Sequence, residues 1–90
     1  MNIIKKADDI VNNRSEEKER QYGPFVESMI RATTIYNSMS PDSEQISVEG
    51  MYRAMIALKF SREAYSHKED NLLDAIAYIG SMNDYIQENK

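Results

Sequence analysis

The sequence predicts an all-α domain, a small four-helix bundle-like fold with an antiparallel C-terminal helical hairpin. Apolar residues recur at helical spacing along the chain, and no stretch shows the alternation of a half-exposed strand. The 90 residues correspond to one small domain, 1–90. A lone core of this size is marginal, and the chain has no cysteine for a disulfide. We therefore expect a homo-oligomer to complete the fold.

The N-terminal part of the chain predicts one helix followed by a charged connector. A helix is expected over residues 2–12, with one apolar face made of Ile3, Ile4, Ala7, Ile10 and Val11. The connector covers residues 13–23, of which 14–21 include six charged residues and no apolar one. With nothing to bury, this segment is expected to be a solvated connector or a short helix.

Three further helices are indicated by their start signals. Gly23-Pro24 predicts a helix over residues 24–39, because proline at the first helical position loses no intrahelical hydrogen bond. Ser47 is a suitable N-cap for a helix over residues 47–65. Asp70 can cap or lead a helix over residues 70–87. The short link between the last two helices predicts that they lie antiparallel.

Two cations break the apolar pattern of the third expected helix. Lys59 and Arg62 fall within its apolar stripe, and a charge on a core-facing side needs an acidic partner or a bound anion. Asp70 and Asp74, four residues apart, share one face of the fourth helix. Across a hairpin, Lys59 would meet Asp74 and Arg62 would face Asp70. Two interpretations stay open, namely structural ion pairs between helices or a polar pocket for a small charged ligand.

Composition disfavours several classes of function. The net charge is −4, whereas non-specific nucleic-acid binding needs a basic face. No apolar run approaches the ~20 residues of a membrane span, and Asp8 and Asp9 disfavour a signal peptide. We therefore expect a cytoplasmic protein with neither a nucleic-acid nor a membrane partner. A single histidine and no cysteine are a poor metal signature, so no metal and no cofactor are expected.

Several segments together resemble a family of small tailed-phage proteins, an all-helical domain of unknown function. Its members carry an Arg-x-Tyr-Gly turn, a Lys-x-x-Arg on the third helix and an Asp-x-x-x-Asp-x-x-x-Tyr on the fourth. The matching segments are Ala7-Asp8-Asp9-Ile10-Val11, Arg20-Gln21-Tyr22-Gly23-Pro24, Leu58-Lys59-Phe60-Ser61-Arg62, and His67-Lys68-Glu69-Asp70 through Asp74-Ala75-Ile76-Ala77-Tyr78. The resemblance spans nearly the whole chain.

That family is similar in helix arrangement to the MazG-like nucleotide pyrophosphohydrolases. Those enzymes hold magnesium with Glu-Glu-x-x-Glu on one helix and Glu-x-x-Asp on another, since clustered oxygen ligands suit Mg²⁺. This chain departs from the pattern. Glu16-Glu17 would need an acid at position 20, where Arg20 stands, and Asp70 and Asp74 are four residues apart instead of three. Cations in place of acids favour an anion site, so we expect no catalytic residues.

The resemblance implies a phage-encoded, non-enzymatic protein that sequesters a small nucleotide-derived host molecule, a counter-defence sponge of the host cytoplasm. Cations would grip phosphates, a tyrosine would stack on a base, and Asp74 would accept from ribose hydroxyls or base amines. The residues expected to bind this anionic ligand are Arg20, Tyr22, Lys59, Arg62, His67, Lys68, Asp70, Asp74 and Tyr78. The alternatives are a MazG-like nucleotide pyrophosphohydrolase and a helical protein-interaction module.

Overall fold

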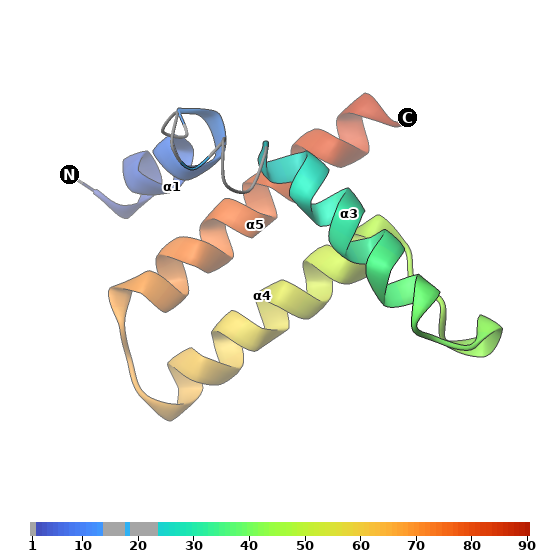
Figure 1. Cartoon of the computed structure of the whole chain (residues 1–90). Helices are drawn as coiled ribbons and strands as arrows, with labels where there is room; N and C mark the ends of the chain where they lie inside the picture. Colours follow the sequence, from blue (N-terminus) through green and yellow to red (C-terminus); the bar gives the residue numbers. More distant parts are fainter. Residues whose placement is uncertain (1, 14–17, 19–23) are drawn as a thin grey trace.

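The computed structural model describes residues 2–13, 18 and 24–90, and this part of the chain is helical without a strand. The helices are α1 (Ile3–Asn12), α3 (Phe25–Ser38), α4 (Val48–Tyr65) and α5 (Glu69–Glu88), with a short 3-10 turn, η1 (Asp42–Glu44), before α4 (Figure 1). The predicted all-α class and its four helices are confirmed. The expected connector lies outside the described residues, apart from Asn13 and Lys18. None of the described helices has the length and apolar character needed to cross a membrane.

Local hydrogen bonds account for where the helices begin. The Ser47 side chain accepts from the backbone N–H of Gly50 at 3.0 Å and caps α4, as the sequence predicts. Asn2 caps α1 in the same way, accepting from Lys5 N–H at 2.8 Å. Pro24 lies one position before the first residue of α3 and is its N-cap. Asp70 lies in the first turn of α5, where a carboxylate suits the positive end of the helix dipole.

Helix α5 is the centre of the fold and packs against α4, α1 and α3 (Figure 1). An ion pair of 2.7 Å between Lys6 and Glu69 ties α1 to the start of α5. The buried residues of the described chain are mostly small, and they are Ala7, Met29, Thr33, Tyr52, Ala75, Ala77 and Ser81. Small side chains on α5 allow its neighbours to approach closely, but they leave a thin core.

Two polar contacts join α4 and α5. Tyr52 and Ser81 are both fully buried and share a hydrogen bond of 2.7 Å between their hydroxyl groups. About two helical turns further along α4, Lys59 forms an ion pair with Asp74 at 3.1 Å. The side of α5 that holds Ser81 and Asp74 therefore faces α4.

The apolar side of α5 is not the side that carries Ser81 and Asp74. The leucines and isoleucines that the sequence places on that side are Leu72, Leu73, Ile76, Ile79 and Ile86. The structure leaves Ile79 45% exposed and buries Ser81 instead. A serine can be buried here because its hydroxyl group is satisfied by Tyr52.

Candidate functional site: a hollow at the α4–α5 turn

A surface hollow of about 470 Å³ lies where α4 ends and α5 begins, and we call it the turn hollow. Its lining residues come from the last turns of α4, the link between the helices and the first turn of α5. They are Ser61, Arg62, Tyr65, Ser66, Lys68 and Asn71. This lining combines two cations with hydroxyl and amide groups and includes no carboxylate. Such a set of side chains suits an anion.

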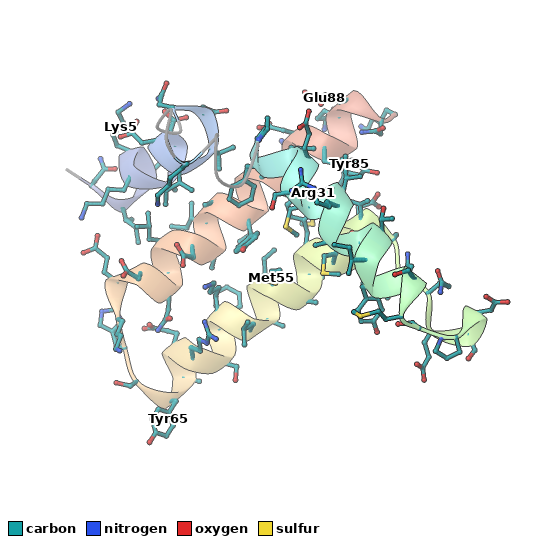
Figure 2. All side chains as sticks on the ribbon, in the orientation of Figure 1. Lys5, Arg31, Met55, Tyr65, Tyr85 and Glu88 are labelled. Atoms are coloured by element: carbon teal, nitrogen blue, oxygen red, sulfur yellow. The ribbon has the colours of Figure 1, made fainter. Side chains whose placement is uncertain are left out.

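The end of α4 determines how Arg62 and Tyr65 are presented. They lie three residues apart and therefore on neighbouring positions of one helix face. The helix ends at Tyr65, and Ser66 follows in an extended conformation, so the chain leaves the helix axis beside the tyrosine. Tyr65 is 94% exposed, and Figure 2 shows its ring extending away from the helices. The ring is thus open to stacking by a planar group.

The two cations of the turn hollow are not neutralised by the protein. In the part of the chain that the structure describes, neither Arg62 nor Lys68 has a side-chain ion pair. The acids next to them in sequence have other partners: Glu69, which follows Lys68, pairs with Lys6, and Glu63, which follows Arg62, is bound by the link between the helices. Glu63 contacts the His67 ring and accepts from Lys68 N–H at 3.1 Å and, weakly, from the Asn71 side chain at 3.4 Å. Both cations therefore remain available to a bound anion.

The contacts of Glu63 predict acid sensitivity of the turn. The hydrogen bond with His67, followed by those from Lys68 and Asn71, lowers the pKa of Glu63 below its ordinary value of 4.5. A carboxyl group whose pKa is lower in the folded state stabilises that state above its unfolded pKa. We therefore expect this stabilisation to be lost as the pH falls from about 4.5 through the folded pKa.

Carbon-13 NMR titration of the Glu63 carboxyl group, together with amide exchange at Lys68, measures this loss. In Glu63→Gln, the Lys68 amide should exchange faster at neutral pH, and its protection should no longer change as Glu63 would titrate. An ordinary glutamate pKa for Glu63 would contradict the contacts described above.

The ion pair between Arg62 and Asp70, which the sequence left open as one of two interpretations, does not form within the described chain. Arg62 is exposed, and it forms no ion pair with Asp70 although the structure describes both residues. The reason is helical geometry. Arg62 follows Lys59 by three residues and lies about 60° short of a full helical turn from it. Glu63 follows Lys59 by four residues and lies only about 40° past a full turn. Glu63 therefore continues the side that faces α5, and Arg62 turns toward solvent.

Lys59 belongs to the helix contact and not to the turn hollow. Its side chain is only 15% exposed, and its Nζ lies 3.1 Å from Oδ2 of Asp74. It does not line the hollow. Of the two interpretations that the sequence left open, structural ion pairing describes Lys59 and Asp74.

The other expected binding residues are dispersed. His67 and Asp70 are exposed beside the link, and Tyr78 packs edge-on against Phe25 with 5.2 Å between ring centroids. Arg20 and Tyr22 lie outside the described residues. Of the nine predicted residues, only Arg62 and Lys68 line the turn hollow.

Four residues of the turn hollow were not predicted, namely Ser61, Tyr65, Ser66 and Asn71. Only Tyr65 carried a signal, because it follows Arg62 by three residues at the end of a helix.

The described residues contain no group of three His, Cys, Asp or Glu side chains that could hold a metal ion. Glu16 and Glu17, the acids that resemble half of a pyrophosphohydrolase motif, lie outside the described residues.

Comparison with known proteins identifies the family. Residues 2–86 match a family model described as a domain of unknown function, DUF6378, and the chain therefore belongs to this family. Neither a curated protein nor a solved structure matches the chain.

Proposed function

We propose that this DUF6378 protein binds a small nucleotide-like anion in the turn hollow and holds it without converting it chemically. The observation that carries the proposal is that Arg62 and Lys68, which have no ion pair within the described residues, lie beside the exposed ring of Tyr65. Phosphate and a planar base are the two parts of a nucleotide that such side chains recognise.

Each part of the turn hollow has a role in this proposal. Arg62 presents a planar fork of donors that matches two phosphate oxygens, and Lys68 adds a mobile point charge. The hydroxyl groups of Ser61 and Ser66 can donate to further phosphate oxygens. Tyr65 offers the face of its ring to a base.

The proposal includes an antiparallel α4–α5 hairpin, because the turn hollow lies at the bend between these helices. The order of the contacts supports it. Tyr52 and Lys59 follow one another along α4, while their partners Ser81 and Asp74 occur in the reverse order along α5.

The proposal also includes self-association and a biological role. Among the described residues the core has five buried apolar side chains, and three of them are alanines, so an oligomer would add burial that one chain lacks. A phage-encoded protein that sequesters a host nucleotide signal is the role that fits binding without turnover. Self-association and this biological role are proposed in addition to the binding site.

Removing both cations should abolish binding. In Arg62→Ala/Lys68→Ala we expect the affinity for the tightest-binding anion to fall by at least ~100-fold. The reason is that a hydrogen bond to a charged group is worth about 1.5–3 kcal/mol and two such groups are lost. Calorimetry and thermal stability, with inorganic phosphate, nucleotides, cyclic dinucleotides and ADP-ribose as probes, measure the effect. Product analysis with Mg²⁺ accompanies each probe.

Arg53→Ala is the matched control, because Arg53 is an exposed arginine on the same helix and does not line the hollow. It should bind as the unaltered protein does. Pyrophosphate release would instead support the MazG-like alternative. If none of the probes binds or stabilises the unaltered protein, the proposal is wrong and an interaction module becomes the better description.

A further inference from the structure

Helix α5 carries an apolar stripe on the side that faces away from α4, and we call it the α5 seam. Its residues are alternately four and three positions apart, and they are Leu72, Ile76, Ile79, Asn83 and Ile86. Ile79 and Asn83 each lie two residues from Ser81, which places them about 160° around the helix from it. Because Ser81 faces α4, the seam faces the opposite way. Alternating four-three spacing is the pattern of a coiled-coil interface.

The middle of the seam is not covered by the described chain. Ile79 is 45% exposed, and Asn83 is exposed and has no hydrogen bond within the described residues. Gly80 lies between them, and none of the described atoms comes within 4 Å of the position where its Cβ would be. A glycine inside a helix costs about 0.5–1 kcal/mol relative to alanine. Packing within the described chain gives no reason for this glycine, whereas the close approach of another helix would.

A second hollow, of about 280 Å³, adjoins the seam on the side of α1. Ile76, Gly80 and Asn83 of α5 contribute to its lining, together with Ile4 and Val11 of α1, and the carboxylates of Asp8 and Asp84 lie at it as well. This hollow can receive apolar side chains from a helix laid along the seam.

The distribution of charge indicates which partner fits. The chain has a net charge of −4, so an interface between two copies is favoured where it brings no further like charges together. The seam is such a surface, and the positions flanking it are also uncharged. The flanking residues are Leu73, Gly80, Met82, Gln87 and Asn89, while Ala75, at the remaining flanking position, is buried within the chain. From Leu72 onward, the acids of α5, which are Asp74, Asp84 and Glu88, all lie outside these positions.

We propose that a second copy of this chain docks on the α5 seam, with the two α5 helices parallel. The orientation follows from Asn83. In a parallel pair Asn83 meets Asn83 of the partner subunit, and the two amides can bond to each other, as a lone asparagine does in parallel coiled coils. An antiparallel pair would place Asn83 opposite a leucine or isoleucine of the seam, because heptad a positions then face heptad d positions, and would leave its amide unsatisfied. This interface is independent of ligand binding at the turn hollow.

Replacing Ile79 with lysine tests the interface. We expect the full chain to sediment as a dimer at micromolar concentration and Ile79→Lys to sediment as a monomer, because the change buries two like charges at the seam. Ile35→Lys is the matched control, since Ile35 is a 52% exposed isoleucine on α3, and it should remain a dimer. A monomeric unaltered chain, or a dimer that persists in Ile79→Lys, would overturn the proposal.

A cysteine at the seam tests the orientation. The chain has no cysteine, so any disulfide comes from the introduced residue. Ile86→Cys leaves Asn83 in place and should form a disulfide-linked dimer under mild oxidation, because parallel helices bring position 86 of the two copies together. Glu88→Cys, an exposed position off the seam, should not. Equal cross-linking of the two variants, or none at position 86, would overturn the parallel arrangement.

Discussion

Replacing Tyr52 with alanine should lower the free energy of unfolding by about 3–5 kcal/mol, the range for removing a buried aromatic ring. Tyr52 is the largest fully buried side chain of the described chain. Its ring lies 6.3 Å from that of Tyr85, measured between centroids, and its hydroxyl group bonds to Ser81. Small domains have only about 5–15 kcal/mol of stability in total, so much of the protein would unfold.

Two further variants separate the ring of Tyr52 from its hydroxyl group. Burial raises the pKa of Tyr52, so the phenol is neutral at pH 7 and bonds to Ser81 as a neutral group. Tyr52→Phe should cost about 1 kcal/mol, and Ser81→Ala about 1–3 kcal/mol because it leaves the phenol unsatisfied. Urea unfolding of these variants and of Tyr52→Phe/Ser81→Ala gives the coupling between the two groups. A loss below 1 kcal/mol for Tyr52→Ala would show that Tyr52 is not the centre of the core.

The helices were predictable because their signals are local. Apolar spacing and the Ser47 cap depend on residues within a few positions of each other, and the structure contains both. The buried pair of Tyr52 and Ser81 was not predictable in this way. A serine between apolar positions looks exposed, and only its partner on another helix makes its burial possible. The exposure of Ile79 was not predictable for the same reason. Its place in an apolar stripe indicates burial, but it is exposed because none of the described helices covers it.

Only those contacts of the candidate site that follow from residue spacing along the helices could be predicted. Lys59 and Asp74 could be paired from the expected hairpin, and the structure contains this ion pair. Arg62 forms no such pair with Asp70, because a three-residue step leaves it about 60° short of a full helical turn from Lys59. Tyr65 was missed because its exposure depends on where α4 ends and how the link leaves it.

Replacing Lys59 with glutamate should lower the free energy of unfolding by about 2–4 kcal/mol. The change removes an ion pair whose lysine is 15% exposed and places a second carboxylate beside Asp74. Breaking a fully buried pair costs about 3–5 kcal/mol, and exposed pairs contribute about 0–1 kcal/mol. Asp74 is 37% exposed, so water offsets part of the repulsion. Urea unfolding at neutral pH measures the loss.

The matched control is the charge exchange Lys59→Asp/Asp74→Lys, which restores opposite charges across the two helices and should recover part of the lost stability. Lys59→Met keeps the aliphatic stem and should cost only about 1 kcal/mol, because Asp74 can be hydrated. Ligand binding then shows whether Lys59 is only part of a structural ion pair or also part of the anion site. Folded Lys59→Met should bind a nucleotide-like anion as tightly as the unaltered protein does, since Lys59 does not line the turn hollow. Loss of binding in Lys59→Met at unchanged stability would instead make this lysine part of the anion site and move that site toward the middle of the α4–α5 contact.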